Sequence, residues 1–297
     1  MTRFAFLIDP LAASGDAGSF DSTITQIDPD APALSVGDLS ANRGDGVFES
    51  IGVFDGRPKQ VEAHLERLAN SARLLELPEP NLAQWSRAVE TAVAAVPAEG
   101  EWTIKLLLSR GVQIGGPGAP ASGPTAWITA SAAPDMTAAR ESGIRVVTLD
   151  RGYDSRAAQR SPWLLLGAKT LSYAVNMAAA REAHRRGADE AIFTTTDGYL
   201  LEAPTANVVL RRGDHFVTPE PTGGLLHGTT QLAAFDWLEE QGHPTGYEHL
   251  PTAALADADA AWFLSSIRLA APVVSIDGRE LPVDRELTAR LNAHLRG

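Results

Sequence analysis

Residues 163–202 decide how this chain folds, and they read WLLLGAKTLSYAVNMAAAREAHRRGADEAIFTTTDGYLLE. The apolar run at residues 163–168 predicts a short strand, and it ends at Lys169. A helical pattern of apolar residues follows at once, over residues 171–186, and Gly187 is the expected stop. The sequence therefore predicts a lysine at a strand-to-helix junction.

The second half of the same stretch predicts a β-hairpin. Asp197 and Gly198 stand between two apolar runs, at residues 191–195 and 199–203. Asp-Gly between apolar runs is typical of the tight turn of a hairpin. The return arm of this hairpin carries Glu202, so an acid follows the lysine at a defined place in the predicted fold.

Lys169 also stands out in the composition. The chain has 25 basic residues, but lysine occurs only at positions 59, 105 and 169. Arginine stays protonated and cannot form a Schiff base, whereas a buried lysine can supply a neutral amine. A lysine next to an apolar run is thus a candidate for amine chemistry. The alternative is a strand-end lysine with its head in solvent.

Length, charge and composition exclude several classes of protein. The chain has 297 residues, 44% of them hydrophobic, which favours two domains with ample cores. No apolar stretch has the length of a membrane span, and the N-terminus has too brief an apolar run for a signal peptide. We therefore expect a cytoplasmic protein that does not bind membranes. The net charge of −12 argues against nucleic acid as a partner, and the absence of cysteine excludes disulfides and thiolate metal sites.

Strands and helices alternate along the first part of the chain. Strands are predicted at residues 46–54, 102–108 and 125–132, with helices at 61–77 and 81–96. The expected domains are a smaller N-terminal α/β domain at residues 1–133, a linker at 134–143, and a larger C-terminal domain at 144–297. The fold class is therefore α/β (α+β) with two domains.

Two places in the predicted fold suit an anion. Thr229 and Thr230 precede a helix predicted at residues 231–241, where free N–H groups and the helix dipole favour negative charge. Ser266 ends a strand predicted at residues 260–264 and forms a second cluster of hydroxyl and amide groups. An ordinary threonine N-cap is the simpler alternative for the first place.

Other catalytic motifs are missing from the sequence. No glycine-rich dinucleotide motif follows a strand, GAKT lacks the glycine spacing of a phosphate loop, and no histidine pair has zinc-ligand spacing. No nucleophile elbow is present either, and no metal is expected. A lysine, an acid on a hairpin, an arginine and two anion-binding clusters together are the set that pyridoxal 5′-phosphate requires.

Five segments carry a resemblance to a known family. They are RGDGVFES from Arg43, HLERL from His64, GAKTLS from Gly167, YLLEAPTANVV from Tyr199 and LLHGTTQ from Leu225. The chain resembles the class IV aminotransferases of fold type IV, a family that includes branched-chain and D-amino-acid aminotransferases and 4-amino-4-deoxychorismate lyases. The matching stretches extend from about residue 43 to residue 278, which is most of the chain.

The resemblance implies a role for each residue of a cofactor site. It makes Lys169 the Schiff-base lysine and proton-transfer base, Glu202 the partner of the pyridine nitrogen, and Arg67 a phosphate ligand. It also implies two α/β domains, with most cofactor contacts in the larger one, and a homodimer. The implied cofactor-binding residues are Arg67, Lys169, Tyr173 near the phenolic oxygen, Glu202, Asn207 as its companion, Leu226 against the ring, Gly228, Thr229, Thr230 and Ser266.

Departures from the family pattern bear on the substrate. Residues 112–118 lack the arginine and histidine that D-amino-acid aminotransferases use as a carboxylate trap, and Gly111 follows Arg110 where branched-chain enzymes have proline. Ala203 replaces the glycine after the acid, and Gln231 replaces an arginine. D-amino-acid specificity is therefore not expected.

The pattern as a whole resembles 4-amino-4-deoxychorismate lyases, which release 4-aminobenzoate and pyruvate for folate biosynthesis. Such a substrate is a small molecule with two carboxylates, so Arg43 and Arg110 are candidate partners, although either can equally be structural. Phe48 and Glu49 on the first predicted strand are expected to face the substrate. An amino-acid transaminase of branched-chain or D-amino-acid type is the alternative, and a cofactor-binding homologue without turnover ranks third.

Overall fold

A computed structural model describes residues 3–16, 18–116, 118–119, 121–221 and 224–297. The chain divides into two compact units. Unit 1 consists of Met1–Pro134 and Ala168–Tyr173, and unit 2 consists of Asp135–Gly167 and Ala174–Gly297. No helix in the described part of the chain is both long enough and apolar enough to span a bilayer.

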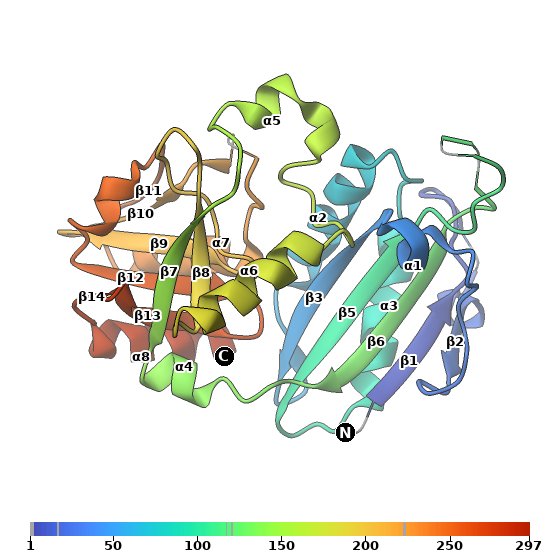
Figure 1. Cartoon of the computed structure of the whole chain (residues 1–297). Helices are drawn as coiled ribbons and strands as arrows, with labels where there is room; N and C mark the ends of the chain where they lie inside the picture. The colour runs from blue at the N-terminus through green and yellow to red at the C-terminus, as the bar shows by residue number, and fades with distance from the viewer. Residues whose placement is uncertain (1–2, 17, 117, 120, 222–223) are drawn as a thin grey trace. The chain divides into compact units, whose positions relative to one another are not determined.

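Unit 1 is one antiparallel sheet with two helices on one face (Figure 1). The order of its strands is β2-β1-β6-β5-β3-β4. Helix α2 packs on β3, and α3 packs on β1, β5 and β6. The elements are β1 (Arg3–Ile8), η1 (Phe20–Thr23), β2 (Ile24–Ile27), α1 (Leu39–Arg43), β3 (Gly46–Phe54), β4 (Arg57–Pro58), α2 (Val61–Leu74), α3 (Leu82–Ala95), β5 (Glu101–Ser109) and β6 (Thr125–Ala132).

The periodicity of α2 explains its place in unit 1. Leu65, Leu68 and Ala72 recur at helical spacing and are buried against the sheet. His64 and Ser71 are buried on the same helix, so polar side chains also enter this interface. The three strands and two helices that the sequence predicts in this unit are confirmed, although α2 ends at Leu74, three residues before the predicted end.

Unit 2 has an eight-stranded sheet in the order β11-β10-β9-β12-β13-β7-β8, with β14 on β13. β7 pairs in parallel with β8 and β13, and β10 pairs in parallel with β11. The helices include α6 on β7 and β8, α7 on β11 and β12, and α8 on β13 (Figure 1). The elements are α4 (Thr137–Glu141), β7 (Ile144–Asp150), α5 (Ala157–Arg160), η2 (Pro162–Leu164), α6 (Ala174–Arg185), β8 (Glu190–Thr194), β9 (Asn207–Arg212), β10 (His215–Pro219), α7 (Thr229–Glu240), β11 (Thr245–Glu248), η4 (Thr252–Leu255), β12 (Ala260–Ser265), β13 (Leu269–Ile276), β14 (Arg279–Glu280) and α8 (Arg285–Arg296).

The predicted strand at residues 163–168 is wrong. Pro162–Leu164 form a 3₁₀ turn, Trp163 is 73% exposed, and Leu165 has a positive φ of 53°. An apolar run becomes a buried strand only where a neighbouring strand accepts its hydrogen bonds, and this run has none. Helix α6 likewise begins at Ala174 and not at residue 171.

Residues 169–171 pair instead with the beginning of β3. The Phe48 amide donates to the Lys169 carbonyl at 3.0 Å, and the Leu171 amide donates to the Gly46 carbonyl at 2.8 Å. β4 pairs only with Val53 and Phe54 at the far end of β3, which leaves this edge available. Residues 168–173, expected in the C-terminal domain, therefore group with unit 1.

The predicted linker at residues 134–143 contains helix α4. This helix packs on β13 and α8 and so groups with unit 2. The hairpin that bears Glu202 does form. The Leu201 amide donates to the Phe193 carbonyl at 2.9 Å, and the Phe193 amide donates to the Glu202 carbonyl at 3.0 Å.

Candidate active site

Lys169 lies beside the ring of Phe48 in unit 1. Its Nζ is 4.6 Å from the centroid of that ring, within the range of a cation–π contact. The backbone of Lys169 is held on both sides, because its amide donates to Ser71 Oγ at 3.1 Å and its carbonyl accepts from Phe48. The ring of Tyr173 meets Phe48 edge-on at 5.4 Å. The structure therefore brings three of the predicted site residues together.

A glycine makes this close packing possible. A Cβ added to Gly46 would lie 2.7 Å from the Leu108 carbonyl oxygen and 2.7 Å from a Leu171 methyl carbon. Neither neighbour can move easily, since the oxygen belongs to the paired strand β5 and Leu171 is fixed by its hydrogen bond to Gly46. Gly46, the second glycine of the RGDGVFES segment, thus allows the lysine-bearing segment to pack against the edge of β3.

Arg67 pairs with a fully buried carboxylate. Its Nε donates to Glu49 Oε1 at 2.7 Å, and its Nη2 donates to Glu49 Oε2 at 2.8 Å. His64 Nδ1 lies 2.7 Å from the same Oε2. The side chains of Glu49, His64 and Arg67 are 0%, 1% and 11% exposed. Such a bidentate, buried pair fixes the plane of the guanidinium.

The charges of this cluster follow from its surroundings. Burial alone would raise the pKa of Glu49, but the charge and hydrogen bonds of Arg67, with the hydrogen bond of His64, hold that pKa well below its ordinary value. Burial lowers the pKa of His64, and the charges of Arg67 and Lys169 lower it further. The cluster is therefore an ionised carboxylate between a guanidinium and a neutral imidazole.

The position of Glu49 differs from the one predicted. Successive residues of a strand point to opposite faces of the sheet, so Phe48 and Glu49 cannot both face one ligand. Phe48 lies beside Lys169, whereas both carboxylate oxygens of Glu49 are taken by α2. Glu49 is a positioning residue for Arg67, and its expected contact with substrate is not supported.

Arg110 also serves the scaffold of unit 1. Its Nε donates to Asp45 Oδ2 at 2.7 Å, and its two terminal nitrogens donate to the carbonyls of Leu75 and Glu76 at 2.6 and 3.1 Å. These bonds fasten the end of α2 to the loop before β3. Arg43 is the exposed last residue of α1. Of the two arginines proposed for the substrate, Arg43 remains the better candidate.

Glu202 is oriented by two hydrogen bonds within unit 2. The Leu226 amide donates to Oε1 at 3.2 Å, and Asn207 Nδ2 donates to Oε2 at 3.3 Å. The same amide nitrogen of Asn207 donates to the Leu226 carbonyl at 2.8 Å. These hydrogen bonds join the return arm of the hairpin, the start of β9 and the segment before α7.

Tyr153 is a neighbour of Glu202 that sequence reasoning missed. It packs against Leu201 and Leu225 on the loop after β7. Burial raises the pKa of Tyr153 to about 12, and the nearby carboxylate of Glu202 contributes to the rise. The phenol therefore stays protonated at neutral pH. The only local signal for it in the sequence is an aromatic residue shortly after the apolar run at residues 144–149.

The place predicted to bind an anion lies at the start of α7. Gly228 is the N-cap residue, and Thr229 and Thr230 are the first two residues of the helix and are buried. Thr230 Oγ1 donates to Ser266 Oγ at 3.5 Å, which joins the two predicted hydroxyl clusters. A Cβ on Gly228 would lie 1.9 Å from Asn207 Oδ1, so the site requires glycine there.

Gln231, which stands in place of the family arginine, is 2% exposed and neutral. Its Nε2 donates to Tyr247 Oη at 3.2 Å, and His227 Nε2 lies 2.9 Å from the same oxygen. The first turn of α7 is thus tied to β11 by a hydrogen bond from the neutral amide of Gln231.

A buried ion pair connects two turns of unit 2 that lie next to predicted site residues. Arg268 Nη2 donates to Glu190 Oε2 at 2.8 Å, with the two side chains 13% and 6% exposed. Thr205 Oγ1 donates to the same oxygen at 3.1 Å. The pair links the turn after Ser266 to the turn between Glu202 and Asn207. Single charged residues in the sequence did not reveal it, because its members are far apart along the chain.

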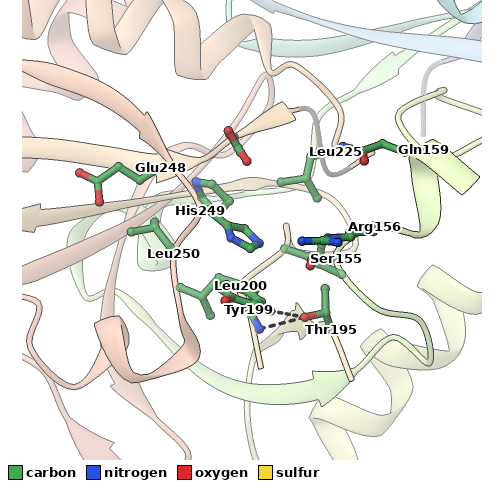
Figure 2. A pocket seen from close by; sticks show the side chains of 13 residues that line it. Ser155, Arg156, Gln159, Thr195, Tyr199, Leu200, Leu225, Glu248, His249 and Leu250 are labelled. Carbon is green, nitrogen blue, oxygen red and sulfur yellow. Dashed lines mark hydrogen bonds between the residues drawn. The ribbon is translucent and has the colours of Figure 1, made fainter. Parts of the chain in front are cut away.

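Unit 2 also contains a cavity of about 360 Å³. Figure 2 shows side chains around it, including Arg156, Tyr199 and His249. The rings of Tyr199 and His249 stack with centroids 3.6 Å apart. Leu201 and Leu225, which directly precede Glu202 and Leu226, are further wall residues. None of the predicted cofactor residues lines this cavity.

The described residues fit pyridoxal 5′-phosphate. Unit 1 offers a lysine amine beside an aromatic ring and an arginine whose plane is fixed. Unit 2 offers an oriented carboxylate and a helix N-terminus with buried hydroxyls, where N–H groups and the helix dipole favour a phosphate. This donor set matches the aldehyde, the ring nitrogen and the phosphate of that cofactor.

Comparison with known proteins places the chain in a family. The family model for amino-transferase class IV matches residues 46–276. The chain therefore belongs to the class IV aminotransferases, which are pyridoxal 5′-phosphate enzymes of fold type IV.

Individual relatives are similar over nearly the whole chain. The chain is 46% identical over 276 residues to a bifunctional aminodeoxychorismate lyase / D-amino acid transaminase of Mycobacterium tuberculosis, covering 89% of this chain and 92% of that relative. It is similar to the structure of the fold IV-transaminase CpuTA1 from Curtobacterium pusillum, with a TM-score of 0.91, 46% identity and coverage of 100% and 99%. A hypothetical aminotransferase from Mycobacterium tuberculosis in its PLP-bound form gives a TM-score of 0.86, 42% identity and coverage of 98% of each chain.

Proposed function

We propose that this enzyme is a 4-amino-4-deoxychorismate lyase, which releases pyruvate and 4-aminobenzoate for folate biosynthesis. The observation that carries the proposal is the 46% identity to a relative whose printed name includes this activity. The sequence pattern at residues 43–49, 167–172 and 225–231 points the same way. The lyase reaction needs one substrate and no second keto acid.

Lys169 is the proposed catalytic residue. When bound, the cofactor supplies an electron sink for the charge that develops as the substrate loses a proton. Lys169 would hold the cofactor covalently, and its free amine would take the proton from the substrate ring carbon that bears nitrogen. The ring of Phe48, 4.6 Å from Nζ, stabilises the ammonium and so helps Lys169 hold that proton. The bond between the ring carbon and the enolpyruvyl oxygen would then break and the ring would become aromatic. The released enolpyruvate would take up a proton to give pyruvate.

The remaining residues hold and orient the cofactor. Glu202, fixed by Leu226 and Asn207, is proposed to keep the pyridine nitrogen protonated. Arg67, Thr229, Thr230 and Ser266 are proposed to bind the phosphate. Leu226 is proposed to lie against the ring and Tyr173 near the phenolic oxygen, and Gly228 allows the start of α7 to pack on Asn207.

A D-amino-acid transaminase is the second candidate. The name of the relative from Mycobacterium tuberculosis includes this activity as well, and CpuTA1 is named a transaminase. The same lysine would then move a proton between two carbon atoms, so the cofactor site does not distinguish the reactions. Residues 112–118 lack the carboxylate trap of D-amino-acid aminotransferases, which argues against D-amino acids as substrates. This argument is weaker because a relative that is 46% identical is named for both activities.

Product analysis separates the two reactions. Purified holoenzyme is incubated with 4-amino-4-deoxychorismate and no keto acid, and pyruvate and 4-aminobenzoate are measured by chromatography. The proposal expects both products in equal amounts, and none from the Lys169→Ala variant. If product forms only when a D-amino acid and a second keto acid are supplied together, the enzyme is a transaminase and the lyase proposal is wrong.

A homodimer is proposed for the active enzyme. Four large apolar side chains of unit 2 are well exposed, namely Trp163 at 73%, Leu164 at 46%, Val175 at 50% and Met177 at 50%. Large apolar side chains left in solvent on these two helical segments are candidates for contacts between chains. Light scattering should give twice the mass of the 31.5 kDa chain, and Met177→Glu should shift the equilibrium toward the monomer.

A further inference from the structure

A groove of about 400 Å³ lies between helices α4 and α8 of unit 2. Arg285, Thr288, Ala289 and Arg296 line it from α8, at spacings that place them on one face of the helix. The middle of this face carries Thr288, Ala289 and Asn292, and its two ends carry arginines. The groove is therefore cationic at both ends and uncharged along α8 between them.

The charge of the groove is opposite to that of the protein. Among its lining residues are three arginines, Arg140, Arg285 and Arg296, and one acid, Glu141, whereas the chain carries a net charge of −12. Arg285 Nη1 donates to the backbone carbonyl of Glu141 at 2.7 Å, so its guanidinium already reaches across toward α4. Guanidinium groups bind carboxylate and phosphate groups with paired hydrogen bonds.

Arg140 connects the groove to the turn after Ser266. Its Nε donates to the Arg268 carbonyl at 2.9 Å, and its Nη2 donates to the Ile267 carbonyl at 2.7 Å. Arg268 in turn makes the buried ion pair with Glu190. An anion that forms hydrogen bonds with the guanidinium of Arg140 competes with the carbonyls of Ile267 and Arg268. Its binding therefore changes the hydrogen bonds that hold this turn.

We propose that this groove is an effector site for a small anion with two or more carboxylate or phosphate groups, and that Arg140 transmits its binding to the turn that bears Ser266. Arg285 and Arg296 are eleven residues apart, or about 16 Å along the helix axis. An ion with a single charged group cannot engage both ends, so the ligand that uses both must carry two or more charged groups. The binding half of the proposal is independent of the proposed function, and the link to the cofactor rests on the phosphate role of Ser266.

Calorimetric titration of the holoenzyme tests the binding site. Citrate and pyrophosphate serve as probes, each at constant ionic strength, and the tighter binder shows whether carboxylate or phosphate is preferred. Arg285→Gln is expected to weaken binding by about 10-fold or more, the effect of losing one charge-assisted contact. Arg290→Gln is the control, because Arg290 lies on the same helix but contacts Gln241 and Trp237.

Two results would overturn the binding site. One is the absence of saturable binding of either probe to the wild-type holoenzyme. The other is equal weakening by Arg285→Gln and Arg290→Gln, which would mean that the probe responds to overall charge and not to the groove.

The link to the cofactor is tested by its affinity with and without citrate. The dissociation constant of pyridoxal 5′-phosphate, measured by fluorescence, should rise about 5-fold or more when citrate saturates the groove, a usual size for coupling between sites. Arg285→Gln should abolish this effect and leave cofactor affinity without citrate unchanged. An equal effect of citrate on Arg285→Gln would indicate competition at the phosphate site and would reject the link. Neither readout uses turnover, so both stand whichever reaction the enzyme catalyses.

Discussion

Replacing Glu49 by glutamine tests the buried cluster that orients Arg67. The variant keeps the shape of the side chain but removes the charge that both Nε and Nη2 of Arg67 contact. The guanidinium is only 11% exposed and would remain charged without a counter-ion. Removal of one member of a buried ion pair costs about 3–5 kcal/mol of unfolding free energy. We therefore expect Glu49→Gln to lower the free energy of unfolding by about 3–5 kcal/mol.

The pH dependence of stability gives a second signature. The pKa of Glu49 in the folded protein lies well below its ordinary value of 4.5. A carboxylate of this kind contributes stability that is fully present above pH 4.5 and is lost as the pH falls below it. The slope in that acid range is about 1.4 kcal/mol per pH unit for one proton. Glu49→Gln should make the slope shallower by up to this amount.

Urea unfolding of the apoenzyme at several pH values measures both effects. The matched control is Glu66→Gln, which changes an exposed acid next to Arg67 on the same helix. In the control, the free energy of unfolding should fall by less than about 0.5 kcal/mol, as is usual for surface substitutions. If Glu49→Gln loses no more unfolding free energy than the control, and if its stability depends on acid pH as in the wild type, the ion pair does not stabilise unit 1.

Three further predictions concern the cofactor site. Lys169→Ala should abolish turnover and the borohydride-reducible link to the cofactor, and a reducible protein-bound adduct in this variant would reject the assignment. Arg67→Ala should weaken cofactor affinity by roughly 1.5–3 kcal/mol, more than Thr230→Ala, whose backbone N–H contacts survive; equal, wild-type affinity in both would place the phosphate elsewhere. Glu202→Gln should slow proton removal by several powers of ten, at about 1.4 kcal/mol of barrier per tenfold, with little loss of cofactor; loss of cofactor with normal turnover of the bound enzyme would make Glu202 structural.

Local patterns in the sequence predicted most of the regular elements. Strand β3 alternates, α2 has an apolar stripe, and Asp197-Gly198 makes the turn that its chemistry favours. The helix predicted at residues 231–241 is also present as α7, although it begins two residues earlier, at Thr229. These features depend on residues a few positions apart, so a single sequence is enough to reveal them.

The chemistry of the site was also visible in the sequence. The residue types that a pyridoxal phosphate enzyme needs stand in segments that resemble those of one family, and the family is confirmed. The individual roles of Lys169, Glu202 and Arg67 are still predictions. Their local surroundings agree with those roles, since Lys169 lies beside Phe48 and Glu202 is held by Asn207 and Leu226.

Only the tertiary structure decided where the lysine segment lies and which charges are paired. Residues 169–171 pair with β3, more than a hundred positions earlier in the chain, and the apolar run before them begins with two exposed residues, Trp163 and Leu164. Glu49, predicted to face the substrate, holds Arg67 instead. Arg110, for which the sequence left a substrate contact and a structural role open, holds the end of α2. Backbone pairing and buried ion pairs join residues that are distant in sequence. Their stability depends on burial and on the available partner, which local periodicity does not encode.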